Sequence, residues 1–262
     1  MSINNNQNTD IQANQNEETR ARISTVKNLK RRFVRKDVLA MVLLFGLMLI
    51  APLFPSVKGW MLSQASLVII YIIAALGVMV LVGFTGLVSV GHGGFLAIGA
   101  YTSALLTLHL GVDLVVGIIA ALLMSGLIGA GLALIFLRLS GAFMAIGTLG
   151  FAFFVGTILN NIPFFQGRDG ILLDANFVLG FEIYDHGFYL VSVVCLILVT
   201  LFVYMLVNSG TGRAFMALRD AEKAAMASGV NRLKFRTLAF SISAAITGIA
   251  GALNAHVVNY VS

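Results

Sequence analysis

Long apolar stretches alternate with short polar ones along most of the chain, and this pattern is the main structural signal in the sequence. A helix needs roughly 20 apolar residues to cross a bilayer. Stretches close to this length predict seven spans, at residues 38–54, 62–82, 88–110, 114–137, 142–162, 188–207 and 237–258. We therefore predict an all-α fold, a polytopic transmembrane helix bundle.

The stretch at residues 88–110 is the least regular of the seven. Gly91, Gly93 and Gly94 surround His92 near its beginning. Glycine allows the backbone conformations in which a helix starts or breaks, and irregular backbone at membrane depth must be buried in protein or line a wet cavity. We expect a broken or re-entrant start. His92 is either a structural histidine or part of a transport path or proton relay.

Composition supports a membrane protein and leaves few signs of chemistry. Hydrophobic residues make up 59% of the chain and charged residues 11%, too little polar surface to cover a soluble globule. The single Cys195 lies in an apolar stretch, so neither a disulfide framework nor a metal site is expected. The sequence shows no nucleophile with a base and no paired carboxylates, so we expect no enzyme and name no catalytic residue.

Charge indicates how the bundle is oriented. The basic residues flank apolar spans and do not interleave with aromatics, which favours a membrane over a nucleic-acid partner. We interpret residues 1–37 as a disordered basic tail, followed by a transmembrane domain at 38–262. Because Lys and Arg collect on the cytoplasmic side, the N-terminus is predicted to be cytoplasmic. Alternation then places the charged segment 208–236 inside and the acidic loop 163–187 outside.

The charged segment is too polar to cross a bilayer, yet its apolar residues recur at helical spacing. Ser209 or Thr211 is suited to cap a helix, and Gly229 is suited to end it. Arg219 and Glu222 stand three residues apart and could form an ion pair. These features predict a short amphipathic coupling helix on the cytoplasmic face, of a size that fits a groove in a partner protein.

Three stretches resemble segments of one protein family. The run GRAFMALRDAEKAAMASGVNRLKFRTLAFSISAAITGIAGAL resembles the EAA-type coupling loop of bacterial ABC importer permeases, in the form found in branched-chain amino acid permeases of the LivM type. GLVSVGHGGFLAIGAYTSALL and GAFMAIGTLGFAFFVGTILNN are similar to two other recurring segments of that family. The resemblance covers roughly residues 60–260.

The resemblance implies that the charged segment docks into a cytoplasmic ATPase subunit. It assigns this role to Arg219, Asp220, Glu222, Lys223, Ala224, Ala225 and Gly229. Lys223 stands where the general pattern has a glutamate, and Glu222 lies one position earlier. Since the chain has no G-x-x-x-x-G-K-[ST] phosphate loop, we expect no cofactor on this chain, with ATP bound by the partner.

The resemblance also implies the rest of the assembly. It implies a second permease subunit, forming a heterodimer, a periplasmic substrate-binding protein and a multi-pass location among the lipids of a bacterial inner membrane. The implied substrate is a branched-chain or related amino acid, or urea or an amide. Candidates for the translocation path are His92, Thr148 and Asn161.

Two other functions stay open. A secondary transporter driven by an ion gradient would need titratable groups at mid-membrane, and only His92 and His109 are counted in the predicted span interiors. Family members continue through further spans after the position of Ser262, so the chain is either a fragment or a natural truncation. An inactive truncated permease or a scaffold is therefore the remaining alternative.

Overall fold

The structure is a computed structural model. It describes residues 41, 43–50, 52, 58–136, 141–162, 165, 170–173, 177–178, 181–182 and 185–261. The predicted tail, residues 1–37, lies outside the described residues. The first predicted span, 38–54, is described only in part, with helix at residues 41 and 43–50. These helical residues belong to the unit Met1–Ala51, separate from Pro52–Ser262. The other predicted spans and the charged segment all lie in this second unit.

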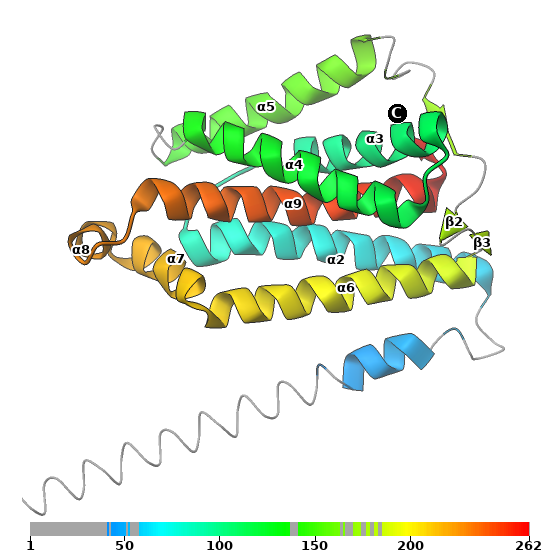
Figure 1. The fold of residues 1–262 in the computed structure, drawn as a ribbon, viewed down its shortest axis with the longest axis horizontal. Helices are drawn as coiled ribbons and strands as arrows, with labels where there is room; N and C mark the ends of the chain where they lie inside the picture. The colour runs from blue at the N-terminus through cyan, green and yellow to red at the C-terminus, as the bar shows by residue number, and fades with distance from the viewer. Residues whose placement is uncertain are drawn as a thin grey trace, which may run out of the picture. The chain divides into compact units, whose positions relative to one another are not determined.

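Six helices among the described residues are long and apolar enough to cross a membrane. They are α2 (Gly59–Thr85), α3 (His92–Leu110), α4 (Leu114–Phe136), α5 (Ala142–Asn161), α6 (Asp185–Asn208) and α9 (Arg232–Val258). Consecutive spans run in alternating directions along the bundle (Figure 1). The predicted all-α membrane bundle is confirmed by these six helices. A helix satisfies its backbone hydrogen bonds within itself, as the lipid environment requires.

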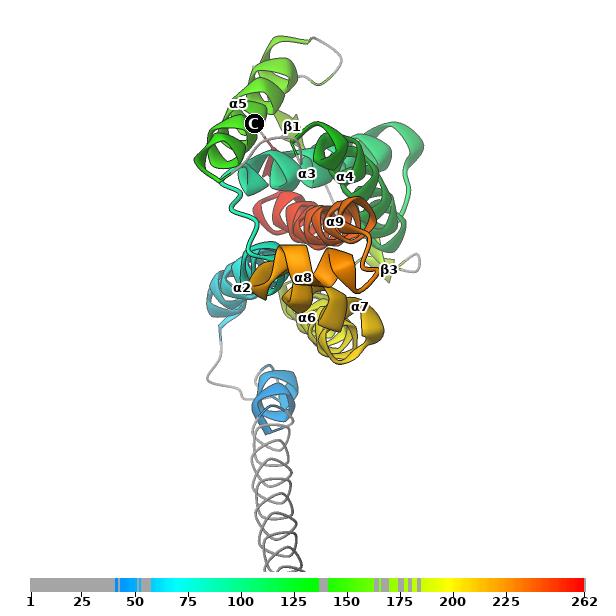
Figure 2. The ribbon, with the colours of Figure 1, turned by 90° about the vertical axis from the view of Figure 1, so that its left-hand side faces the viewer.

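The helix α9 forms the centre of the bundle. It packs against α2, α3 and α4, and Figure 2 shows it between α2 and α6 on one side and α3 and α4 on the other. Small residues allow this close packing. Ala244 lies against Gly129 of α4, and Gly248 lies against both Gly99 of α3 and Ser125 of α4.

The third predicted span opens with a non-helical stretch. Gly86 ends α2 in the left-handed conformation, with φ of 69°, and residues 86–91 are not helical before α3 starts at His92. The expected broken start of the span 88–110 is therefore confirmed at residues 88–91, and the helix itself begins at His92. Two hydrogen bonds hold the residues before α3: the Val90 N–H donates to Thr148 Oγ1 of α5, and Ser89 Oγ bonds to His92 Nδ1.

Short strands gather at one end of the bundle, on the right in Figure 1. Strand β1 (Ile171–Leu172) pairs antiparallel with β4 (Tyr260–Val261), and β2 (Phe177–Val178) pairs with β3 (Phe181–Glu182). The β1 and β4 pair joins the segment after α5 to the segment after α9. The charged segment lies at the opposite end.

Candidate functional site

The charged segment folds as two short helices, α7 (Gly210–Asp220) and α8 (Glu222–Ala227), and not as the single helix predicted. The side chain of Ser209 caps α7 by accepting the Gly212 N–H at 3.3 Å. At Ala221 the backbone leaves the helical region, with φ of −150° and ψ of 75°. We call α7, α8 and their flanking turns, residues 209–231, the elbow.

The helix α8 ends just before Gly229, as the sequence predicts. Gly229 has φ of 87°, its N–H donates to the Met226 carbonyl at 3.0 Å, and the Val230 N–H donates to the Ala225 carbonyl at 3.0 Å. This pair of bonds is a Schellman motif, which satisfies the last carbonyls of α8 and reverses the chain. The turn leads directly into Asn231, whose side chain caps α9.

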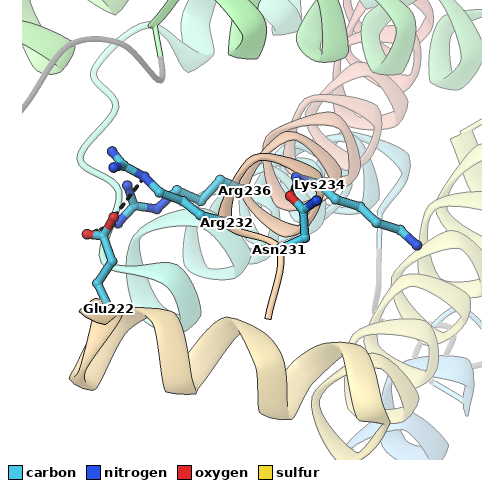
Figure 3. Close-up of polar contacts among 5 residues, drawn as sticks. All are labelled: Glu222, Asn231, Arg232, Lys234 and Arg236. Carbon is cyan, nitrogen blue, oxygen red and sulfur yellow. Dashed lines mark hydrogen bonds and ion pairs between the residues drawn. The ribbon is translucent and has the colours of Figure 1, made fainter. Parts of the chain in front are cut away.

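Two arginines of α9 hold Glu222 (Figure 3). Glu222 Oε1 lies 2.8 Å from Arg232 Nε, and Oε2 lies 2.9 Å from Arg236 Nη2. Lys234 points away from this cluster. The predicted pair between Arg219 and Glu222 is therefore wrong, because the turn at Gly229 brings the first residues of α9 over the carboxylate.

Arg219 instead connects the elbow to α2. Its Nε lies 2.8 Å from Asp220 Oδ1, and its Nη1 donates to the carbonyl of Gly83 at 2.6 Å. The hydrogen bond to Asp220 raises the pKa of the Arg219 guanidinium, which stays protonated. A cation on the last carbonyls of a helix is favoured by the helix dipole, so Arg219 acts as a C-terminal cap of α2.

Apolar contacts fix the elbow onto the bundle. Phe215 and Leu218 of α7 are buried, and Phe215 shares a core cluster with Leu81 of α2 and Phe240 of α9. The bend at Ala221 lets α7 and α8 both turn buried residues inward. The elbow is consequently a braced projection and not a loose loop.

The structure brings the seven predicted docking residues together on this elbow but exposes them unequally. Ala225 is buried and Glu222 is half-buried in its ion pairs. The exposed members are Arg219, Asp220, Lys223, Ala224 and Gly229. A partner would thus meet mainly the exposed group, while Glu222 and Ala225 maintain the shape of the elbow.

His92 is buried in a hydrogen-bonded chain that uses both ring nitrogens. Ser243 Oγ donates its proton to the Gly77 carbonyl at 2.6 Å, so His92 Nε2 must donate to Ser243 Oγ, at 2.7 Å. The neutral ring then accepts at Nδ1 from Ser89 Oγ, at 3.1 Å. This arrangement ties the start of α3 to α2 and α9, which agrees with the structural interpretation of His92.

The other two path candidates lie at different places. Thr148 is buried next to the segment before His92, where its Oγ1 accepts the Val90 N–H at 3.1 Å and donates to the Ala145 carbonyl at 2.9 Å. Asn161 is exposed at the far end of α5, with its Nδ2 donating to the Thr157 carbonyl. Thr148 and Asn161 are thirteen positions apart along the helix, a rise of roughly 20 Å. The structure brings His92 and Thr148 together and leaves Asn161 apart.

Sequence analysis missed His256, a third histidine in a predicted span interior. It is buried in α9 with Nε2 2.9 Å from Ser103 Oγ of α3. The pairing of Glu222 with Arg232 and Arg236 was also missed. A histidine inside an apolar span was a signal for the first, since a buried imidazole needs a hydrogen-bond partner. The second had no such signal, because it depends on the direction of the turn at Gly229.

Two grooves in the bundle surface are almost entirely apolar. One, of about 810 Å³, lies between α3, α4 and α5 and includes Tyr101, Thr102 and His109; the other, of about 570 Å³, lies between α4, α6 and α9. Neither is lined by an acidic residue, a lysine or an arginine among the described residues. Neither groove therefore offers an ionic partner for the charged groups of an amino acid.

Comparison with known proteins identifies the family. Residues 60–262 match the model of the branched-chain amino acid transport system / permease component family. The chain belongs to this permease family. It is 35% identical over 246 residues to the high-affinity branched-chain amino acid transport system permease protein LivM of Salmonella typhimurium and, equally, to that of Escherichia coli. Each of these matches covers 84% of this chain.

The chain spans 58% of the length of these curated relatives. No solved structure matches the chain. The family match includes the elbow and all six described spans, from within α2 to the end of α9. The resemblance seen in three stretches of sequence is confirmed, and with six membrane-capable helices the protein is a multi-pass membrane permease component.

Proposed function

We propose that this chain is the membrane-spanning subunit of an ATP-driven importer for branched-chain or related amino acids in a bacterial inner membrane. Its family and the names of its relatives support this substrate class. In this proposal a separate cytoplasmic ATPase subunit binds ATP. A second permease subunit and a periplasmic substrate-binding protein complete the importer.

The braced elbow is the observation that carries the proposal. It projects from one end of the bundle (Figure 1), and its exposed Asp220, Lys223 and Ala224 offer a small charged surface to a partner. Glu222, through Arg232 and Arg236, keeps that surface in a fixed position relative to α9. A rigid projection of this kind transmits movement, whereas a loose loop would absorb it.

The proposed mechanism is alternating access. ATP binding draws two ATPase subunits together, the docked elbow moves with them, and the bundle changes between states open to opposite sides of the membrane. ATP can shift this equilibrium only by the difference in its affinity for the two states of the complex. The six described spans hold no acidic side chain except Asp185, the first residue of α6. These spans therefore offer no mid-membrane carboxylate to couple transport to an ion gradient.

A charge-reversal experiment tests the docking. The tagged chain is coexpressed with the ATPase encoded beside its gene, and Asp220→Lys with Lys223→Glu is compared with the wild type. Each side chain is exposed, so the melting temperature should not change. We expect about tenfold less co-purified ATPase, equivalent to roughly 1.4 kcal/mol of binding free energy.

Lys58→Glu is the matched control, because Lys58 is exposed before α2 at the opposite end of the bundle. It should leave the amount of ATPase unchanged. Undiminished ATPase with the doubly reversed elbow would contradict docking at this surface. In reconstituted vesicles, leucine uptake that proceeds without any ATPase and stops when the proton gradient is collapsed would instead favour secondary transport.

A further inference from the structure

The six residues between α2 and α3, 86–91, are held by side chains from three different elements. We call this segment the α2–α3 joint. It is not helical, and it lies directly between the elbow and α5. Its contacts include hydrogen bonds, close approaches at two glycines and the buried side chain of Leu87. The hydrogen bonds connect the elbow and α5, which share no other described polar contact.

The elbow holds the beginning of the joint. Arg219 Nη1 donates to the Gly83 carbonyl in the last turn of α2. The stem of Arg219 also lies against Gly86, where an added Cβ would come within 2.9 Å of Arg219 Cγ. Gly86 thus meets two requirements, a positive φ at the end of α2 and room for the arginine. Any displacement of the elbow acts on this point.

The end of the joint is anchored to the centre of the bundle. Ser89 and His92 form the hydrogen-bonded chain to Ser243 of α9 and to the Gly77 carbonyl of α2. Leu87 is buried in the same core cluster as Phe215 of the elbow. The C-terminal end of the joint is therefore fixed to α9 through His92, while Gly86 at its N-terminal end contacts Arg219 of the elbow.

The joint also holds α5. The Val90 N–H donates to Thr148 Oγ1, and Gly91 lies so close to the Thr148 backbone that a Cβ would have no room. Among the six described spans α5 has the smallest buried share, 22% of its most apolar window. Its outer side chains, such as Phe153, are exposed. Because it packs mainly on α3, α5 is the span that the bundle restrains least.

We propose that the α2–α3 joint is a relay that passes the position of the elbow to α5. Arg219 is the positioning residue at its input and Thr148 the positioning residue at its output. The inference rests on the proposed function, in which the elbow is moved by an ATPase. The contact of Val90 with Thr148 then converts that movement into a displacement of the least restrained span.

The test uses the complete importer reconstituted in vesicles, with uptake of radiolabelled leucine and ATP hydrolysis measured together. Thr148→Val removes the acceptor of the Val90 N–H at nearly constant volume. The residue is 1% exposed, so it cannot touch an ATPase. We expect ATPase co-purification and hydrolysis to persist, while leucine moved per ATP falls about three- to tenfold, the effect of losing one buried hydrogen bond from the coupling.

Two further substitutions separate positioning from a general structural role. Thr148→Ser keeps the hydroxyl and should restore the ratio of leucine to ATP. Thr157→Val is the matched control: on the same helix Thr157 Oγ1 donates to the Phe153 carbonyl and the residue is exposed, away from the joint. It should leave the ratio unchanged. An equal fall with Thr157→Val would assign the effect to α5 in general and overturn the relay.

Gly86→Ala tests the input without replacing any docking residue, and co-purified ATPase is measured alongside because Arg219 belongs to the exposed docking group. The added Cβ displaces the stem of Arg219 from the joint, and the same fall in the ratio is expected even if Thr148→Val does not fold. A normal ratio in Gly86→Ala, or in a folded Thr148→Val, overturns the relay while the importer stands. A wild-type complex that takes up no leucine, or retains no ATPase, overturns the proposed function and the relay with it.

Discussion

Glu222 links the elbow to α9 through ion pairs with Arg232 and Arg236. We expect these pairs to contribute as much to the free energy of unfolding as the strongest exposed ion pairs. The Arg236 side chain is only 12% exposed, so water competes weakly for this contact. We expect Glu222→Gln to cost about 1 kcal/mol, at the upper end of exposed pairs, and to speed amide exchange at residues 222–230. Hydrogen exchange by mass spectrometry measures this.

Asp220→Asn is the comparison for that experiment. Asp220 is 64% exposed and pairs with the adjacent Arg219, so its loss should leave exchange in α8 close to the wild type. Equal exchange rates in the two variants would show that Glu222 does not brace the elbow.

The chain from Ser89 through His92 to Ser243 makes a second prediction at the residue scale. His92→Ala and Ser243→Ala each leave buried polar partners unsatisfied and should destabilise the bundle by about 1–3 kcal/mol. Because both remove the same hydrogen bond, the double variant should cost less than the two single costs added, by about 0.5 kcal/mol or more. Denaturant unfolding in detergent measures all three. Strict additivity would mean that His92 and Ser243 act independently.

Individual residues show where prediction from sequence succeeds and where it stops. Gly229 could be predicted to end its helix because the requirement for a positive φ is local. The partners of Glu222 could not, because they depend on the direction in which the chain leaves that glycine. His92 was singled out from its glycine neighbours, but one of its two serine partners, Ser243, lies 151 positions away.

At the scale of elements, close helix packing depends on single glycines. Gly248 of α9 faces Ser125 and the Ala121 carbonyl of α4, and a Cβ there would overlap both. Gly248→Ala should therefore destabilise the bundle by about 1–3 kcal/mol, as overpacking does. Gly131→Ala is the matched control on α4, since nothing lies within 4 Å of its added Cβ, and it should be neutral. Thermal unfolding compares the two, and equal losses would contradict the packing described for α9.

The spans themselves were predictable because apolar length is imposed by the bilayer. Two features of the elements were not. No glycine or proline near Ala221 indicates a bend in the sequence. The bend allows α7 to bury Phe215 and α8 to bury Ala225 against the bundle. The partners that hold the start of α3 were the other feature, since only the assembled bundle brings Val90 to Thr148 and His92 to Ser243.

For the whole molecule, the alternation of spans makes a prediction about sidedness. In a Cys195→Ser background, Ala224→Cys on the elbow should resist a membrane-impermeant maleimide added to intact spheroplasts and react once the membrane is opened. Asp113→Cys, between α3 and α4 at the other end, should react from outside. Labelling of Ala224→Cys from outside would invert the predicted topology and remove the elbow from any cytoplasmic partner.

The central position of α9 bears on how the molecule is made. Its partners α2, α3 and α4 leave the ribosome more than ninety residues earlier, at synthesis rates of about 5–20 residues per second. For several seconds their glycine-lined inner surfaces, around Gly77, Gly99 and Gly129, have lipid or an insertase as neighbour. The bundle is therefore incompletely packed until α9 is inserted. We expect it to be most susceptible to membrane quality-control proteases at this stage.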